Sequence, residues 1–453
     1  MNFLLDMGLG KSKVQIDIFR YLQRTGEAKR MLVLVPTISA VESWREQCEL
    51  HAPEQRFAGL SEGMDAAQRW EQITDPQNTI IAVTYMGMLS LVSKIKRADR
   101  DSKGTMVINN RMLDKAVGTF GMVVYDEITA LKNHASTFFR MAKRIGKRVP
   151  RRFGLTGTPV GREPTGLWAE FFAVDQGYAL GPTLGLYRGA FFTEDRGDWN
   201  ERTYTFRKSG KKELRRMMAA SSIRYRADDC LDLPEKIRIR VPIIFSDEAW
   251  DFYSKARDEV RAARGNFQEI ENTYIQMRQL ASGFMSGKIG GEKHFVRLAN
   301  PKLDKLVAML KTEIAPDEKV LVFNDYVYSG DWIEERLKAE GIKTTRLYSG
   351  TRKKGEALRT FKNDPKTQVL IINNQSGAMA LNLQVARYMI FYESPNDPII
   401  RQQAEKRIDR AGQKRKVFYI DLYTKNSVEE RILECVEEGR DFLRELLDGG
   451  QHL

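Results

Sequence analysis

A glycine-containing turn near the first residue constrains the fold more than any other feature of the chain. The turn reads DMGLGKS over residues 6–12; an apolar run precedes it, and apolar side chains at helical spacing follow it. Gly8 and Gly10 let backbone N–H groups approach an oxyanion at a helix N-terminus. Lys11 would reach the outer phosphates of a nucleotide, and Ser12 would hold a metal ion. The pattern predicts a strand, a phosphate-binding turn and a helix; the simpler alternative is an ordinary glycine turn before a helix.

Strand-like and helix-like segments alternate along two parts of the chain. In the first part, four further apolar runs have the length of strands that are buried on both faces, namely MLVLVP, TIIAVT, FGMVVYDE and RFGLTGTP. A second alternating part begins at residue 301 and includes the strand-like runs KVLVF, QVLIIN, YMIFYE and VFYIDLY. This alternation predicts an α/β protein with two doubly wound parallel sheets, in which ligands bind at the carboxyl ends of the strands.

The segments around these two parts set the expected domain boundaries. Residues 165–232 are rich in aromatic residues and helix-like, so we expect a helical insertion within a first lobe of residues 1–235. Residues 236–300 predict a mainly helical linker. It is strand-like over residues 237–245 and helical over residues 248–280, and it ends in a glycine-rich loop over residues 282–291. We expect residues 301–453 to form the second lobe.

Composition narrows the class of protein. With 453 residues, 42% hydrophobic and 29% charged, the chain is typical of a soluble protein of two or three domains. Its net charge of +13 favours a polyanionic partner, and two basic runs, residues 143–152 and 208–216, either contact that partner or face solvent. The cysteines and histidines do not cluster, which argues against a zinc site or a disulfide framework. We expect no membrane span and no signal peptide.

Two acidic residues follow an apolar strand in the same lobe as the phosphate turn. Asp126 and Glu127 would stand at the carboxyl end of this strand. Phosphoryl transfer to water needs one carboxylate near a magnesium ion and a second polar group that positions the water. Asp126 would serve the metal, and Glu127 would orient or activate the water. A solvated acidic pair at a strand end is the structural alternative.

The second lobe ends its alternating part with an arginine-containing segment. The segment QQAEKRIDRAGQKR covers residues 402–415, and Arg407 and Arg410 are three residues apart, so a helix would place them on one face. Such a pair could reach a transferring phosphate and stabilise its charge. A solvated basic helix would have the same pattern.

These motifs, in this order, resemble the Swi/Snf-type ATPases of helicase superfamily two. The segments that are similar to the family's motifs are DMGLGKS (first), VPTISAVESW (Ia), YDEITALKN (second), LTGTP (third), VLVFNDY (fourth), SGAMALNL (fifth) and QQAEKRIDRAGQKR (sixth). The segment CLDLPEK is similar to the family's junction between lobes. The segments LWAEFFAVDQGYALG and MRQLASGF further resemble bacteriophage and prophage members of the family. This second resemblance implies the cytoplasm of a bacterial or phage-infected cell.

The resemblance implies two RecA-like lobes that bind ATP and Mg²⁺ and track along DNA, usually duplex DNA. By position, Gly8, Gly10, Lys11 and Ser12 bind phosphate, Ser12 and Asp126 bind the metal, and Arg407 and Arg410 act as arginine fingers. Three further roles rest on the same resemblance. Thr156 and Thr158 would couple the nucleotide to the DNA, Gln403 would line the nucleotide site, and Asn382 would line the cleft.

The sequence departs from the family's motifs in places. Ile128 and Thr129 replace the usual Ala-His after Asp-Glu, and Ala378 and Ala380 stand where the fifth motif usually has glycine. The adenine-reading element that precedes the first motif in the family has no counterpart upstream of the turn. We therefore expect that the chain is truncated or its start misassigned, or that base recognition is lost or supplied elsewhere.

The sequence therefore predicts a DNA-dependent ATP hydrolase that couples hydrolysis to translocation along duplex DNA. One alternative is a helicase that separates strands, since nothing in the sequence identifies or excludes a wedge. A second alternative is a nucleic-acid-binding scaffold with a degenerate ATP site. The joint presence of Lys11, Asp126, Glu127, Arg407 and Arg410 argues against the scaffold, because binding alone does not need all five.

Overall fold

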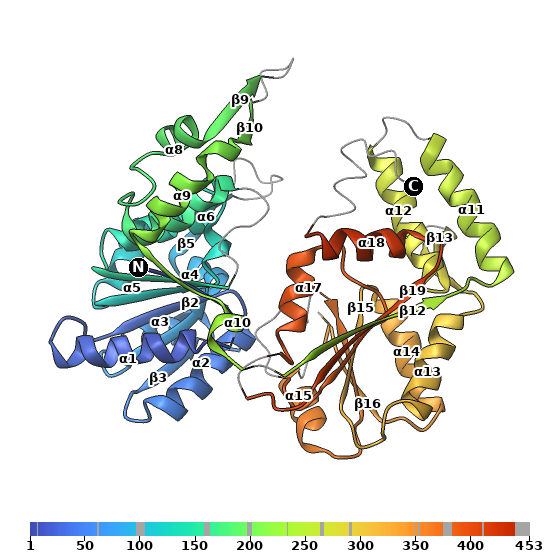
Figure 1. The fold of residues 1–453 in the computed structure, drawn as a ribbon. Helices are drawn as coiled ribbons and strands as arrows, with labels where there is room; N and C mark the ends of the chain where they lie inside the picture. The colour runs from blue at the N-terminus through green and yellow to red at the C-terminus, as the bar shows by residue number, and fades with distance from the viewer. Residues whose placement is uncertain are drawn as a thin grey trace. The chain divides into compact units, whose positions relative to one another are not determined.

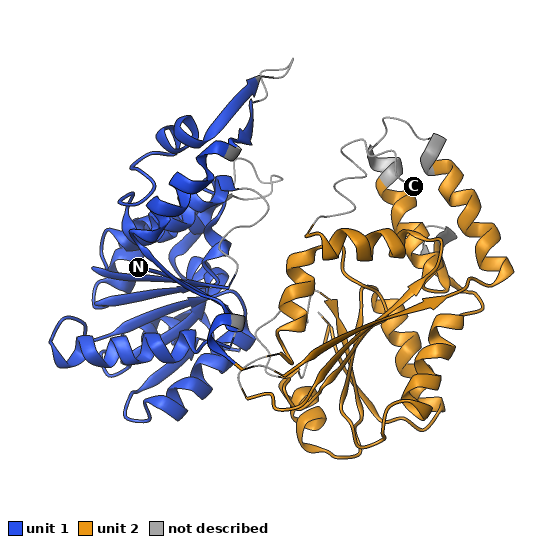
Figure 2. Cartoon of the chain, viewed as in Figure 1, with its two compact units in different colours: residues 1–231 blue, residues 232–453 orange. Residues whose placement is uncertain are grey.

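The computed structural model divides into two compact units, residues 1–231 and residues 232–453 (Figure 2). Each unit is an α/β lobe built on a parallel sheet, as the alternating pattern predicts. The structure describes all residues of the chain except 7, 61–62, 97–104, 158–163, 197–201, 233, 263–266, 290–291, 349, 352–353, 375–382, 410–411 and 440–453.

Unit 1 is built on a seven-stranded sheet in which every pairing is parallel. In sheet order its strands are β11 (Ser222–Tyr225), β1 (Asn2–Leu5), β8 (Arg151–Thr156), β7 (Met122–Asp126), β2 (Met31–Val35), β4 (Ile80–Thr84) and β3 (Phe57–Leu60). Its principal helices are α1 (Lys11–Arg24), α2 (Ile38–His51), α3 (Ala66–Thr74), α4 (Tyr85–Val92), α5 (Asn110–Val117) and α6 (Thr137–Gly146).

Strand β2 shows why the apolar runs form buried strands. Met31, Val33 and Val35 pack into the core on the face that α1 and α2 cover. Leu32 and Leu34 pack into a separate core on the opposite face, which includes side chains of α4, α5 and α6. Because successive side chains of a strand point to opposite faces, a strand between two helical layers must be apolar at every position. Figure 1 shows the helices on the two faces.

Residues 165–232 contain the expected helices α7 (Leu167–Asp175), α8 (Leu184–Phe191) and α9 (Lys211–Ala219). The structure adds strands that the aromatic-rich pattern did not indicate. An antiparallel hairpin joins β9 (Phe192–Arg196) to β10 (Arg202–Phe206), and β11 extends the main sheet by pairing with β1. A second hairpin of unit 1 joins β5 (Ser93–Lys96) to β6 (Thr105–Ile108). A short helix, α10 (Ala227–Cys230), follows β11.

Unit 2 is built on a six-stranded sheet, and all its pairings are also parallel. In sheet order its strands are β12 (Lys236–Ile243), β19 (Val417–Thr424), β18 (Tyr388–Phe391), β15 (Val320–Asn324), β17 (Val369–Asn373) and β16 (Thr344–Leu347). Its helices include α13 (Pro301–Thr312), α14 (Val327–Ala339), α15 (Lys354–Asn363), α17 (Pro398–Glu405) and α18 (Val428–Glu437).

Residues 236–300 contain the expected strand and the expected helical part. Strand β12 belongs to the unit 2 sheet, and two helices follow it, namely α11 (Asp247–Ala262) and α12 (Phe267–Ala281). The predicted glycine-rich loop instead contains a strand, β13 (Phe284–Ile289), which pairs in a hairpin with β14 (Glu292–Arg297) directly after the loop. Gly283 has φ +84°, which lets the chain turn from α12 into β13. Phe284 is fully buried, so an apolar anchor within the glycine-rich segment favours the hairpin over a loop.

Candidate active site

The phosphate turn lies at the carboxyl end of β1, directly before α1. Gly8 and Gly10 have φ +87° and +71°, and Gly10 is the N-cap of α1. A Cβ on Gly10 would meet no atom within 4 Å, so its left-handed backbone, rather than lack of space, requires glycine. Lys11 and Ser12 are the first two residues of the helix, where N–H groups are unpaired within the helix and the helix dipole is positive. This arrangement can bind an anion, as the sequence predicts.

The ammonium group of Lys11 lies over the turn. Its Nζ donates to the carbonyl oxygen of Leu5 at 2.8 Å and to that of Asp6 at 3.4 Å. Burial raises the pKa of Asp126 on β7, and the Lys11 charge opposes this rise, so the turn and Asp126 lie within electrostatic range of each other. The structure therefore brings together Lys11 and Asp126, which are 115 positions apart in sequence.

Asp126 is held by two aromatic residues that the sequence did not assign to the site. Trp44 of α2 donates its indole N–H to Asp126 Oδ2 at 2.8 Å, and Tyr85 of α4 donates its hydroxyl to the Asp126 carbonyl at 3.0 Å. Burial raises the pKa of Asp126, and the Trp44 hydrogen bond and the Lys11 charge oppose this rise. A buried indole or phenol needs a hydrogen-bond partner, which is the one signal that could have pointed to these residues.

Glu127 has the backbone conformation of a strained residue. Its φ is +47° and its ψ is +62°, which a residue with a side chain adopts only at a local cost. Thr156, fully buried at the end of β8, donates its hydroxyl to Glu127 Oε2 at 3.4 Å. Since β8 lies between β1 and β7 in the sheet, this contact links the third motif to the acidic pair. Thr158 lies outside the described residues.

A further carboxyl group lies close to Glu127 and was not predicted from the sequence. Glu170 is only 3% exposed, and all residues of α7 except Asp175 are buried. Burial raises its pKa to about 8; the charge of Lys132 opposes the rise, and that of Glu127 adds to it. Glu170 stands in the aromatic-rich segment LWAEFFAV, where a single polar residue within a buried helix was the available signal.

Replacing Glu170 with glutamine is expected to make the protein more stable than the unmodified one, by an amount that grows with pH. The folded protein retains a proton that the unfolded chain releases above its ordinary pKa of 4.5, so stability falls between pH 4.5 and about 8. At pH 7 this loss amounts to about 3 kcal/mol, which the glutamine variant does not incur. Thermal unfolding at several pH values measures the difference between the two proteins. A difference that does not change with pH would contradict the assignment, and exposed Glu49→Gln is the control.

The predicted arginine pair is arranged differently from the expectation. Helix α17 ends at Glu405, and Arg407 lies in the turn that follows, so the prediction that Arg407 and Arg410 share a helix face is wrong for Arg407. The backbone N–H of Arg407 bonds to the Ala404 carbonyl at 2.9 Å, which tightens the last turn and ends the helix. Arg407 is 2% exposed.

Gln403 is half-buried in α17. Arg410 and Asn382 lie outside the described residues. The roles predicted for Gln403, Arg410 and Asn382 stay predictions.

The possible metal ligands near the turn fit Mg²⁺ bound together with a nucleotide better than a metal site formed by protein side chains alone. Within the described part of the chain, no group of three or more His, Cys, Asp or Glu side chains could hold a metal. Mg²⁺ binds through one or two protein oxygens together with phosphate oxygens and water. The Ser12 hydroxyl and the Asp126 carboxylate can supply such ligands beside a bound phosphate.

The two basic runs differ in their surroundings. In the run 143–152, Arg144 and Arg148 both pair with Asp114 of α5, and Arg152 donates to backbone carbonyls that include that of Val174 at 2.7 Å. These arginines join elements within unit 1. In α9 of the second run, by contrast, four basic side chains are exposed, namely Lys211, Lys212, Arg215 and Arg216, the last of which pairs with Glu213 on the same helix.

Comparison with known proteins identifies the family. The model of the SNF2-related domain matches residues 3–293, and the model of the helicase conserved C-terminal domain matches residues 301–414. The chain belongs to the SNF2-related domain family. Among the described residues of this SNF2-related chain, no helix has the length and apolar character that crossing a membrane requires.

Several proteins are similar to this SNF2-related chain over most of its length. A putative ATP-dependent helicase/translocase, YwqA of Bacillus subtilis, is 22% identical over 94% of the chain and 44% of its own length. The chromodomain-helicase-DNA-binding protein 3 homolog of Caenorhabditis elegans is 25% identical over 96% of the chain and 25% of its own. The probable ATP-dependent DNA helicase CHR12 of Arabidopsis thaliana is 25% identical over 96% and 39%. The chain thus spans less than half the length of these relatives.

A solved structure is also similar to the SNF2-related chain. The Sulfolobus solfataricus SWI2/SNF2 ATPase core in complex with dsDNA is 22% identical, with a TM-score of 0.42, and the match covers 99% of this chain and 89% of that one.

Proposed function

We propose that the chain is an ATP hydrolase that DNA stimulates and that couples hydrolysis to movement along duplex DNA. The observation that carries this proposal is the convergence of the phosphate turn, Asp126, Glu127 and Thr156 at the carboxyl ends of β1, β7 and β8, which are neighbours in one sheet. Membership of the SNF2-related family and relatives named as ATP-dependent helicases support it. The net charge of +13 and the exposed basic side chains of α9 favour a polyanion such as DNA.

The residues of the first unit divide the chemistry between them. Bound ATP with Mg²⁺ supplies the phosphoryl group and neutralises part of its charge. Lys11 would hold the outer phosphates, and Ser12 and Asp126 would bind the metal. Glu127, restrained by Thr156, would orient the attacking water and accept its proton. The strained backbone of Glu127 sets the direction of its carboxylate before substrate binds.

The roles of the remaining predicted residues rest on the family resemblance. We assign Arg407 and Arg410 as arginine fingers and Gln403 to the nucleotide site. Thr158 and Asn382 would take part in coupling to DNA. The segments LWAEFFAVDQGYALG and MRQLASGF favour a place among the bacteriophage and prophage members of the family.

Glu127→Gln is expected to lower the ATP turnover number at least about 100-fold, because an amide accepts the proton of water far less readily than a carboxylate. The amide keeps an oxygen for the Thr156 hydroxyl, so the fold and ATP binding should be retained. Phosphate release in the presence of duplex DNA measures the effect, and Glu49→Gln, an exposed position on α2, serves as control. Unchanged turnover in folded Glu127→Gln would refute the role of Glu127.

A further inference from the structure

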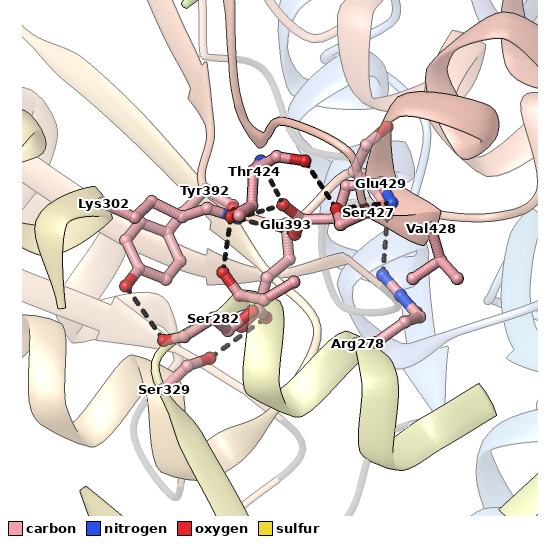
Figure 3. A network of polar contacts seen from close by, with 12 residues as sticks. Arg278, Ser282, Lys302, Ser329, Tyr392, Glu393, Thr424, Ser427, Val428 and Glu429 are labelled. Atoms are coloured by element: carbon pink, nitrogen blue, oxygen red, sulfur yellow. Dashed lines mark hydrogen bonds and ion pairs between the residues drawn. The ribbon is translucent and has the colours of Figure 1, made fainter. Parts of the chain in front are cut away.

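Helix α12 brings a buried arginine to the carboxyl edge of the unit 2 sheet. Arg278 is 6% exposed, forms an ion pair with Asp325 at 2.5 Å and donates to the Ser394 carbonyl at 2.8 Å. Asp325 follows β15, and its backbone N–H donates to Glu393 Oε2 at 2.6 Å. Figure 3 shows Arg278 and Glu393 in a close view of the polar network of unit 2. One guanidinium group thus joins α12 to the segments that follow β15 and β18.

One branch of the network leads toward the fifth motif. The side-chain amide of Asn374 donates to Asp325 Oδ1 at 2.6 Å. Asn374 directly precedes the segment 375–382, which lies outside the described residues and carries most of the motif SGAMALNL. At the other end of this segment, the backbone N–H of Leu383 donates to the Arg407 carbonyl at 3.2 Å. Asn374, which lies before the fifth motif, and Leu383, the last residue of this motif, are therefore each bonded to another segment of unit 2.

The second branch leads to the helix of the sixth motif. Arg401 of α17 donates to Ser394 Oγ at 3.1 Å and forms a buried ion pair with Asp421 at 2.5 Å. Ser394 thus accepts from Arg278 through its carbonyl and from Arg401 through its hydroxyl. Since α17 carries Gln403 and leads into Arg407, the position of α12 is linked through two side chains to the residues of the proposed nucleotide site.

The chemistry of arginine suits this junction. A guanidinium stays charged at any physiological pH and presents five donors in a rigid plane, so Arg278 can bind Asp325 and the Ser394 carbonyl at the same time. A buried ion pair of this kind fixes geometry more than it adds stability. Loss of Arg278 would leave Asp325 without its cation and Ser394 without its link to α12.

We propose that Arg278 is a positioning residue that holds Asn374, Ser394 and α17 of unit 2 in place against α12, so that stimulation by DNA depends on it. Arg278 itself contacts no nucleotide in this scheme and acts through Asp325, Ser394 and their neighbours. The effect on DNA stimulation rests on the proposed function, whereas the effect on local structure does not.

Amide hydrogen exchange tests the structural part of the proposal without any activity. In Arg278→Gln, exchange should become faster at Asn374, Ser394 and α17 and stay unchanged throughout unit 1, because the network lies within unit 2. The matched control is Arg297→Gln, which removes an exposed ion pair with Glu335 on the same unit. Faster exchange confined to α12 would overturn the proposal, whatever the activity.

DNA-stimulated ATP hydrolysis tests the functional part. Arg278→Gln should lower the stimulation by duplex DNA about tenfold and leave DNA-free hydrolysis within about twofold of the unmodified protein, since small displacements of positioned groups have effects of this size or larger. Arg278→Lys keeps the charge but not the fork of donors, so it should restore part of the stimulation. Arg278→Lys also replaces Arg278→Gln in this test if the glutamine variant does not fold.

The possible outcomes separate the two proposals. If no DNA stimulated ATP hydrolysis by the chain, the proposed function would be refuted. Hydrogen exchange would then still decide whether Arg278 positions its neighbours. Stimulation that survives in folded Arg278→Gln, with a melting temperature that is merely lower, would show that Arg278 only stabilises the fold. If Arg278 and Asp325 act as a unit, combining Asp325→Asn with Arg278→Gln should add little to the effect of Arg278→Gln alone.

Discussion

Replacing Lys11 with alanine is expected to lower ATP turnover at least about 100-fold, the usual cost of removing one group that stabilises charge in a transition state. Lys11 is the cation of the phosphate turn and lies at the start of α1, with its ammonium over the turn. Removing it leaves the backbone N–H groups of the turn, which still bind anions but without a full positive charge. Phosphate release at saturating ATP and DNA measures the loss.

A neighbouring lysine on the same helix is the control for this prediction. Lys13 is half-exposed and pairs with Asp17 on the surface of α1, a contact worth less than about 1 kcal/mol. Lys13→Ala should therefore keep turnover close to that of the unmodified protein, and both variants should keep its melting temperature. Equal turnover in the Lys11 and Lys13 variants would contradict a phosphate-binding role for the turn.

Replacing Lys302 with methionine is expected to destabilise unit 2 by about 3–5 kcal/mol, the usual cost of leaving one charge of a buried pair uncompensated. Lys302 is 1% exposed, and its Nζ donates to both carboxylate oxygens of Glu429, at 2.6 and 2.5 Å (Figure 3). The same group donates to the Tyr392 carbonyl at 3.1 Å. Thermal unfolding should show a melting temperature about 10 °C lower for this unit.

Two further variants test the cause of that destabilisation. Adding Glu429→Leu to Lys302→Met should recover much of the lost stability, because an apolar pair of similar volume often replaces a buried ion pair without net cost. Lys305→Met, which removes a surface pair with Glu313, should change stability by less than about 1 kcal/mol. If the double variant were less stable than the single one, uncompensated charge would not be the cause.

The parallel sheets could be predicted from the sequence because their strands are buried on both faces. A run such as MLVLV needs no knowledge of its neighbours to be recognised as such a strand. Strand β11 lacks this signal, since its side chains are half-buried or exposed and it lies at the edge of its sheet. Its pairing depends on a distant partner, which explains why residues 165–232 were expected to be helical. The strand-like run over residues 237–245 could be recognised locally, and the structure confirms it as β12.

The parts of the site that could be predicted are those in which a short continuous motif contains the functional residues. The phosphate turn and the pair Asp126-Glu127 follow strands whose carboxyl ends must share one edge of a parallel sheet. Trp44, Tyr85 and Glu170 could not be placed, because their roles arise from contacts between helices and strands far apart in sequence. The end of α17 at Glu405 was missed for a related reason, since helix spacing alone does not show where tertiary contacts end a helix.

The measurement that tests the central claim most directly is ATP hydrolysis by the purified chain without nucleic acid, with single-stranded DNA, with duplex DNA and with RNA, beside Lys11→Ala. We predict hydrolysis that duplex DNA stimulates strongly and that Lys11→Ala loses. Stimulation by single strands or RNA alone would instead indicate a strand-separating helicase. Intact DNA binding with no hydrolysis under any condition would contradict the account and indicate a nucleic-acid-binding scaffold.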